Sequence, residues 1–268
     1  MLGVILKSRN LKINTMNTEE HNAKIVEQFS KQAIPFTKLS GHLDSIEILK
    51  EMAELKPEDN VLDIACGPGL VLCEFAKTAS QGTGIDITQV MLEQAQERQK
   101  NLGLTNIKWD LGNVTELPYS SNSFSLVITR YSFHHFLDPK KVLSEMYRVC
   151  KPNGRILIAD VVLSKEKVNA FNEMEVIRDN SHTRALTFEE FEELLSLFEL
   201  TNLKRASYKV EMELERQLTA SFPKEGDDEK LRQIFKNDLT ENNLGVESHL
   251  IGNEIHFSYP ISVYVGRK

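Results

Sequence analysis

Short apolar runs alternate with amphipathic segments from residue 60 to residue 162. Apolar runs of about four to eight residues are typical of buried strands, whereas apolar side chains at helical spacing are typical of helices packed on one face. Strands are expected to end near residues 65, 87, 111, 129 and 162, with helices at 69–79, 88–102 and 139–150 between them. This alternation predicts an α/β fold with a parallel sheet that has helices on both faces.

The pattern loosens on either side of this region. A helix predicted over residues 18–32 is followed by Pro35, which disfavours its simple continuation. The apolar segment around Ile34 and Phe36 is expected to form either a lid or a helix on the domain edge. A capping box at 187–190 predicts the start of a later helix. The other predicted elements are helices over 43–55, 165–180 and 211–240, the last interrupted near 223–226, and strands over 200–210 and 255–265.

The chain has no internal repeat and no long linker, so one elaborated domain is expected. Residues 1–16 are basic and lack acidic side chains. They are expected to form a disordered extension, and whether they are a targeting segment stays open. The rest of the chain is expected to divide into a helical lid or edge at 17–56 and a main domain at 57–268. The main domain contains variable helical elements at 165–185 and 211–253.

Composition excludes some classes of protein. The net charge of −7 argues against nonspecific nucleic-acid binding, which needs a basic surface. The three cysteines form no CxxC pair, which favours buried thiols in a reducing compartment such as the cytoplasm over a disulfide framework. No apolar run approaches the roughly 20 residues of a membrane-spanning helix, so stable membrane insertion is not expected.

The segment VLDIACGPGL, residues 61–70, joins an apolar strand to a helix through a glycine turn. A dinucleotide-binding fingerprint has the pattern GxGxxG. Gly67 and Gly69 match its first two glycines, but Leu72 stands where the third is required. No Gly-Lys-Ser/Thr follows, which excludes a P-loop. The turn therefore favours close backbone approach to a ligand over a pyrophosphate cradle.

Two acidic residues extend this interpretation. Asp63 precedes the turn, where a carboxylate repels a pyrophosphate and attracts a cation. Asp86 lies at the tip of the next predicted strand, the usual place for an acid that accepts hydrogen bonds from ribose hydroxyls. Together they indicate a ligand with a ribose, a cationic group and little phosphate, and S-adenosylmethionine fits. The alternative is that Asp63 only caps the turn and Asp86 is a solvated acid at the end of a strand.

Four motifs follow one another along the chain: VLDIACGPG, GIDIT with Met91, ELPY with SFSLV, and RYSFHHF followed by EMYRVCKPNGRILIADVV. In this order they resemble class I S-adenosylmethionine-dependent methyltransferases, in particular the ubiquinone and menaquinone biosynthesis group (methyltransferase type 11). The resemblance covers about residues 29–200. It implies a Rossmann-like, seven-stranded, mostly parallel sheet with an antiparallel last strand, an N-terminal helical lid and a helical insertion before the last strand.

The resemblance also implies a role for each matching residue. Asp63 would help to hold the ammonium group of the cofactor, and Asp86 would accept the ribose hydroxyls. The backbone at 65–67 would line the methionine part, while Ile87 and Met91 would pack on the adenine. The full set of cofactor-binding residues implied is Asp63, Ala65, Cys66, Gly67, Gly69, Asp86, Ile87, Met91, Asn113, Val114 and Arg130.

The sequence departs from the family pattern at two positions. Asn113 stands where the family usually has Asp, which accepts a hydrogen bond from the adenine amino group. An amide oxygen still accepts, without the strength that a charge adds. Ser125 stands where Asp is common after Phe124, and this position is expected to support the strand rather than the ligand.

Three histidines are candidate catalytic bases. His134 and His135 follow the fourth predicted strand, whose carboxyl end should face the methyl group. His182 lies in the variable region, where this fold often builds its acceptor pocket. A histidine suits proton removal near neutral pH. The alternative for all three is a structural, hydrogen-bonded role, and two adjacent histidines lack the spacing of a helical metal site.

These observations predict a methyltransferase that acts on a small, partly hydrophobic organic acceptor. Ile34, Phe36, Phe133, Phe136 and Phe171 suggest that apolar character. The alternatives are a non-catalytic S-adenosylmethionine-binding regulatory or assembly protein, and a nicotinamide dehydrogenase, which the missing glycine disfavours. The acceptor, the atom methylated and the oligomeric state stay open, with a homodimer as one option.

Overall fold

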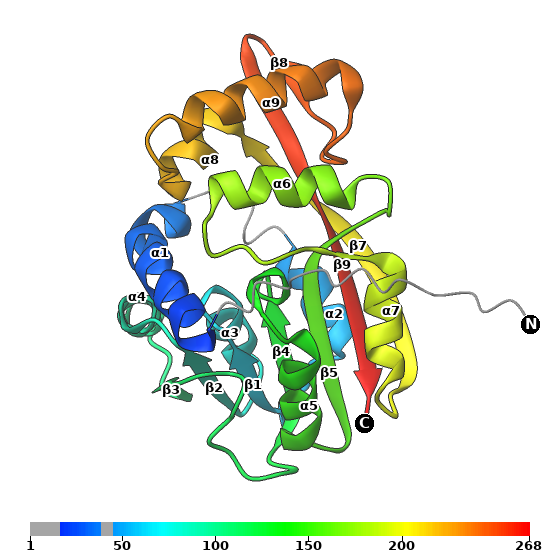
Figure 1. Ribbon diagram of the computed structural model, residues 1–268. Helices are drawn as coiled ribbons and strands as arrows, with labels where there is room; N and C mark the ends of the chain where they lie inside the picture. Colours follow the sequence, from blue (N-terminus) through cyan, green and yellow to red (C-terminus); the bar gives the residue numbers. More distant parts are fainter. Residues whose placement is uncertain (1–16, 39–44) are drawn as a thin grey trace, which may run out of the picture.

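The computed structural model describes residues 17–33 and 45–268 in full and the backbone of 34–38. Seven strands form the body of one sheet: β1 (Asn60–Ile64), β2 (Gln81–Asp86), β3 (Ile107–Leu111), β4 (Phe124–Arg130), β5 (Cys150–Leu163), β7 (Thr201–Glu213) and β9 (Glu254–Arg267). Their order across the sheet is β3-β2-β1-β4-β5-β9-β7. Strand β9 runs antiparallel to both β5 and β7 (Figure 1). The first five strands pair with their neighbours in the sheet in parallel.

The predicted sheet, with an antiparallel last strand, is therefore confirmed. Two short strands were not predicted: β6 (Leu186–Thr187) pairs with β5, and β8 (His249–Ile251) pairs with β9. Strands β7 and β9 are also longer than predicted, since β7 continues past residue 210 to Glu213 and β9 runs from Glu254 to Arg267 instead of 255–265, and most of the added residues are polar.

The helices are α1 (Thr18–Lys38), α2 (Ile46–Ala53), α3 (Leu70–Ala76), α4 (Gln89–Asn101), α5 (Pro139–Val149), α6 (Val168–Arg178), α7 (Phe188–Ser196), α8 (Leu214–Ser221) and α9 (Asp227–Glu241), with a short 3-10 turn at Phe133–His135. Helices α2 and α3 pack on one face of the sheet, and α5 and α7 pack on the other. Because successive side chains of a strand point to opposite faces, Leu126 joins the first cluster and Val127 the second. The predicted capping box of α7 is present, since Thr187 and Glu190 each bond the other's backbone.

Helix α1 continues past Pro35 to Lys38, so the expectation that it ends before the proline is wrong. A proline removes one helical hydrogen bond, and tertiary packing of the rest of a helix can offset that local cost. Here α1 contacts both α4 and α8. The expected extension 1–16 and the side chains of Ile34 and Phe36 lie outside the described residues, so those expectations stay predictions.

Helices α6, α8 and α9 lie together beyond the end of the sheet toward which the parallel strands point, and α1 stands beside them (Figure 1). Ligands of open α/β sheets bind outside the carboxyl ends of the strands. The fold therefore places its variable helices around the usual ligand position. Across residues 17–38 and 45–268, no helix combines the length and apolarity needed to cross a bilayer.

A buried ion pair at the opposite end of the sheet joins Asp59, just before β1, to Arg155 of β5. Arg155 is 4% exposed, and its guanidinium pairs with Asp59 and donates to the carbonyl of Ala53 at 2.8 Å. Ser125 donates to the same carboxylate at 2.7 Å and accepts from the Asn60 amide at 3.0 Å. Ser125 therefore supports the strands, as expected from the sequence.

We expect Asp59→Ala to lower the free energy of unfolding by about 3–5 kcal/mol, because it leaves the buried Arg155 charge without its partner. Urea unfolding measures this loss. The matched control is Glu247→Gln, which removes a pair with Lys209 whose side chains are more than half exposed, and it should barely change the unfolding midpoint. Equal midpoints for the two variants would contradict the role given to the buried pair.

Candidate functional site

A cavity of about 410 Å³ lies at the carboxyl ends of the parallel strands. One end is formed by the segments that follow β1, β2, β3 and β4. The other end is formed by side chains of α1, α6, α8, β7 and β9. The cavity thus joins a region predicted to hold the cofactor to a region built from the variable helices.

The turn after β1 exposes backbone to the cavity. Ala65 and Gly67 both have positive φ angles, of 50° and 51°, and the Cys66 amide bonds the carbonyl of Ile85 at 3.1 Å. A Cβ atom built on Gly67 would meet no atom of the described residues within 4 Å. The turn therefore leaves room for a ligand at Gly67, and Ala65 and Cys66 line the same cavity.

Glycine is required at position 69 by contacts inside the fold. Gly69 is not among the residues that line the cavity. Its φ angle is 71°, and an added Cβ would lie 2.6 Å from the Trp109 ring and 2.9 Å from the Cβ of Ala95. The close approach that Gly69 permits is therefore to β3 and α4, rather than to a ligand as predicted.

Asp63 is the most unusual group of the cavity wall. Its side chain is 2% exposed, and within the described part of the chain its Oδ2 atom has no hydrogen-bond partner. Burial raises the pKa of this carboxyl to about 8, against the opposing effect of the Arg130 charge. The Arg130 charge offsets the burial only in part, so a bound cationic group would supply a partner for Oδ2 and favour the carboxylate.

Asp86 ties the turn to the next strand. Its carboxylate accepts from the Gly67 amide and from the Thr88 amide, both at 2.8 Å. Burial raises the pKa of Asp86, and these two amides act in the opposite direction. A carboxylate has about four acceptor positions, and Asp86 lines the cavity, where it would also accept from the hydroxyls of a ribose.

The other predicted cofactor residues also line the cavity: Ile87, Met91, Asn113, Val114 and Arg130. The Oδ1 atom of Asn113 already accepts from the amide and the hydroxyl of Thr115, at 2.9 and 3.0 Å. An adenine amino group would have to share that oxygen. The guanidinium of Arg130 lies 4.6 Å from the centre of the Tyr131 ring.

These residues fit S-adenosylmethionine. The unpartnered Oδ2 of Asp63 suits its ammonium group, the remaining acceptor positions of Asp86 suit its ribose, and the open backbone at Gly67 suits close approach of its methionine part. The assignment of these roles residue by residue stays a prediction.

His134 forms a buried pair with Asp160 at the rim between the two ends. The Nδ1 atom lies 2.6 Å from the Asp160 carboxylate, which also accepts from the Phe133 and Val161 amides at 2.7 Å. Burial by itself lowers the pKa of His134, but the Asp160 charge outweighs it and holds that pKa above its usual value. His134 therefore carries a proton for more of the time than an ordinary histidine.

His135 differs from its neighbour. Its Nδ1 atom lies 3.0 Å from the Ser181 carbonyl, which can only accept, so Nδ1 carries the proton and Nε2 carries the lone pair. Burial, followed by the His134 charge, lowers the pKa of His135 to about 4. This ring is neutral near pH 7 and lines the cavity.

His182 is placed beside these rings but is not among the cavity-lining residues. Its Nε2 lies 2.8 Å from Asn172 Oδ1, an oxygen that also accepts from the Ala185 amide at 2.7 Å. Burial and the His134 charge lower the pKa of His182 to about 3. These contacts favour the structural alternative for His182, which ties its loop to α6.

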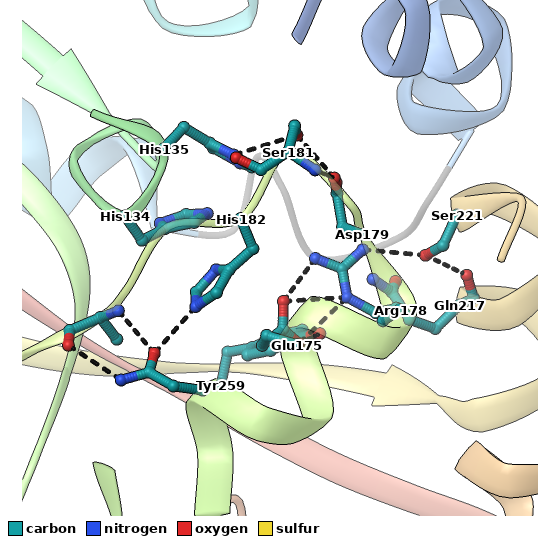
Figure 2. Close-up of polar contacts among 12 residues, drawn as sticks. His134, His135, Glu175, Arg178, Asp179, Ser181, His182, Gln217, Ser221 and Tyr259 are labelled. Atoms are coloured by element: carbon teal, nitrogen blue, oxygen red, sulfur yellow. Dashed lines mark hydrogen bonds and ion pairs between the residues drawn. The ribbon is translucent and has the colours of Figure 1, made fainter. Parts of the chain in front are cut away.

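A cluster of buried polar side chains from α6 and α8 lines the cavity at the end formed by these helices. Arg178 pairs with Glu175 on the same helix and donates to the Ser221 hydroxyl of α8 at 2.9 Å. Figure 2 shows Arg178 reaching toward Ser221, with the rings of His134 and His182 side by side. Asp179 accepts from the Ser181 amide at 2.9 Å, and its pKa falls to about 2 because the charges around it outweigh the effect of burial.

Sequence reasoning missed two buried cavity residues, His21 of α1 and Gln217 of α8. His21 Nε2 lies 2.7 Å from the His135 carbonyl, across 114 positions of the chain. Only the packing of α1 against the later loop reveals this contact, because a lone histidine on a helix carries no local signal. Among the described residues, no group of three or more His, Cys, Asp or Glu side chains is arranged to hold a metal ion.

Comparison with known proteins agrees with this geometry. A family model described as a methyltransferase domain matches residues 55–237. The uncharacterised methyltransferase YcgJ of Bacillus subtilis is 30% identical over 64% of this chain and 70% of its own length. Its crystal structure has a TM-score of 0.78 at 24% identity and covers 85% of this chain and 99% of that one.

Two further similarities are informative. A putative methyltransferase from Bacillus halodurans has a TM-score of 0.73 at 26% identity, covering 83% of this chain and 98% of that chain. The demethylmenaquinone methyltransferase of Listeria welshimeri is 28% identical over 53% of this chain. That alignment spans 64% of the Listeria enzyme, less than two thirds of its length.

Binding of S-adenosylmethionine should release a proton from Asp63. With a pKa of about 8 in the free protein, this carboxyl is mostly protonated near pH 7. A bound ammonium group favours the carboxylate and lowers its pKa, so affinity should increase as the pH rises from about 6 toward 8. Calorimetry near pH 7, in two buffers of different ionisation enthalpy, measures the number of protons released.

Asp63→Asn is the matched variant. It should release no proton and bind S-adenosylmethionine roughly tenfold or more weakly, because a hydrogen bond to a charged group contributes about 1.5–3 kcal/mol. Proton release that is the same in the variant as in the wild type would rule out this role for Asp63.

Proposed function

We propose that this chain, which belongs to the methyltransferase domain family, transfers the methyl group of S-adenosylmethionine to a small, partly hydrophobic organic acceptor. The observation that carries the proposal is one cavity with two unlike ends. The cofactor end has a buried carboxylate with one unpartnered oxygen, and the other end is lined by apolar side chains of α1, α6, β7 and β9.

The residues of the chain contribute mainly by positioning. S-adenosylmethionine supplies, when bound, a methyl group on a positively charged sulfur. Asp63 and Asp86 would fix the orientation of the cofactor, and the loop at 131–138 would face its reacting end. Holding two reactants in line lowers a barrier by up to roughly 7–11 kcal/mol in well-oriented systems. Side chains of helix α1 line the cavity and would help to exclude water during the reaction.

The apolar walls support a partly hydrophobic acceptor. The residues that form them are Ile25, Phe29, Phe171, Val210, Met212 and Ile261. Phe171 was expected from the sequence to contribute here and lines the cavity, whereas Phe133 is buried in the core with α7. The relative in Listeria is named for a quinone precursor, and an aromatic acceptor is consistent with these walls.

The alternative is a non-catalytic S-adenosylmethionine-binding protein of regulatory or assembly function. The occupied Oδ1 of Asn113 gives it some support, since adenine recognition would be weaker than in the usual family pattern. The dehydrogenase alternative does not survive the family assignment. A cytoplasmic location and a homodimer stay predictions.

Asp86→Ala should weaken S-adenosylmethionine binding by more than about tenfold, since it removes a charged acceptor of hydrogen bonds worth about 1.5–3 kcal/mol. Calorimetry measures the affinity. Because Asp86 also holds the turn through Gly67, Asp86→Asn is the control that keeps an acceptor oxygen. It should lose less affinity than Asp86→Ala, and unchanged affinity in both would contradict the ribose role.

The proposed activity itself is tested by a cofactor-consumption screen. The wild type is incubated with S-adenosylmethionine and with quinol precursors, phenols, amines or carboxylic acids, and S-adenosylhomocysteine is measured. We expect product that depends on both the acceptor and Asp86. Tight cofactor binding with no acceptor-dependent product would favour the non-catalytic alternative.

A further inference from the structure

We infer that His21 of α1 contacts the methyl acceptor and receives its proton, and that the acceptor is an uncharged molecule with a hydroxyl group on an apolar body. The inference rests on the proposed function, which it makes more specific. It follows from an unpartnered lone pair, from the charges around it and from the cavity walls.

The proton on the His21 ring is placed by its contact with the loop after β4. Nε2 lies 2.7 Å from the carbonyl oxygen of His135, which has no hydrogen to donate. In the neutral ring, Nε2 must therefore carry the hydrogen and Nδ1 the lone pair. The same contact holds the base form of His21 in one orientation, so the packing of α1 positions the lone pair.

The lone pair of His21 is buried without a partner. The side chain is 3% exposed and lines the cavity, and no described residue offers a hydrogen bond to Nδ1. Gln217 of α8 also has a buried acceptor atom without a partner. It lines the same cavity and is 7% exposed, and its Oε1 accepts no hydrogen bond from any described residue. Buried acceptors without partners are costly. A ligand that donates hydrogen bonds would satisfy both.

The charges of this end disfavour an anionic acceptor. Glu175 is paired with Arg178, and the Tyr259 hydroxyl also donates to it at 2.9 Å. Asp179 adds a further carboxylate whose pKa is lowered to about 2, so it stays ionised. Two carboxylates face one guanidinium, which leaves this part of the wall negative. A carboxylate or phosphate on the acceptor would be repelled.

The walls and the base together favour a hydroxyl group. The apolar side chains of Phe29, Phe171 and Ile261 suit an aromatic or aliphatic body. An uncharged amine can attack through its lone pair before it loses a proton, whereas a hydroxyl oxygen needs its proton removed as the bond forms. A buried base without a competing partner therefore suits a hydroxyl, with a phenol as the simplest case.

His21 suits this step better than its neighbours. His134 is paired with Asp160, whose charge raises the pKa of His134 above its usual value. The pKa of His135 is lowered to about 4. In the step, a lone pair of the acceptor oxygen forms the bond to the methyl carbon, and the carbon–sulfur bond breaks with its electron pair left on sulfur. The hydroxyl proton moves to Nδ1 of His21. The charge lost from sulfur thus appears on the imidazolium, whose Nε2–H still donates to the His135 carbonyl.

The first test uses binding, with 4-propylphenol and its methyl ether, 4-propylanisole, as probes of nearly equal shape. Calorimetry is done on the wild type saturated with S-adenosylhomocysteine. We expect the phenol to bind roughly tenfold more tightly than the ether, because only the phenol donates to the buried lone pair. In His21→Phe this difference should disappear, whereas His249→Phe, at an exposed histidine, should keep it.

The outcomes separate the inference from the proposed function. If S-adenosylhomocysteine does not bind, the proposed function fails. If it binds but the phenol and ether are equal, if neither probe binds, or if His21→Phe keeps the preference, the role of His21 fails and the proposed function stands. Cofactor affinity and the thermal unfolding midpoint of His21→Phe are measured first, to show that the variant is folded.

A second variant, His21→Gln, separates proton removal from positioning. A glutamine can still donate to the His135 carbonyl and accept from a ligand, but it cannot take a proton at neutral pH. For a hydroxyl acceptor that turns over in the screen, we expect His21→Gln to lower kcat by about 10²–10⁴-fold, with KM and cofactor affinity little changed. An unchanged kcat, or a screen in which only amines or carboxylic acids are methylated, would overturn the inference.

Discussion

A carboxylate buried at the end of β1 with one oxygen unpartnered sets the character of this protein. The Arg130 charge offsets the burial of Asp63 only in part, so this group takes up a proton unless a further counter-charge is present. A protein that only needed to fold would do better with an apolar residue at this place. The arrangement is useful when a cationic ligand completes it, and that single requirement explains the carboxylate, the open turn at Gly67 and the missing pyrophosphate cradle together.

The second constraint is that one cavity must hold two reactants from distant parts of the chain. The cofactor end comes from the segments after the first strands, which are close in sequence. The acceptor end is assembled from α1, α6, α8 and the long strands β7 and β9. Helix α1 joins the ends, since it contacts α4 on one side and α8 on the other. Its hydrogen bonds from His21, Gln28 and Gln32 reach backbone and carboxylate atoms across the cavity.

Much of the cofactor end could be predicted from the sequence, because its signals are local. The apolar run before the turn, the two glycines and an acid at the tip of each strand all lie within about 25 residues, and the strand alternation supplies their common edge. Gly69 shows a limit of such reasoning. The sequence correctly predicts a need for glycine at this position. Only the packed structure shows the reason, since a Cβ atom at Gly69 would clash with Trp109 and Ala95.

The acceptor end could not be predicted to the same depth, because it depends on tertiary contacts. Nothing near His21 indicates that its ring meets the His135 carbonyl, and nothing near Gln217 indicates that α8 faces the cavity. The three histidines that were predicted do come together, yet their contacts divide their roles: His134 pairs with Asp160, His135 stays neutral, and His182 bonds Asn172 away from the cavity wall. Pro35 gave a misleading local signal, since packing of the rest of α1 offsets its cost.

Asp63 and Asp86 are expected to bind the two polar parts of one nucleoside cofactor. The decisive measurement is a crystal structure of the protein with S-adenosylhomocysteine. We expect the ammonium nitrogen of the ligand within hydrogen-bond distance of Asp63 Oδ2, and both ribose hydroxyls on the Asp86 carboxylate. A ligand bound in this cavity with its ammonium group away from Asp63, and with Asp86 still bonded only to the turn, would contradict it.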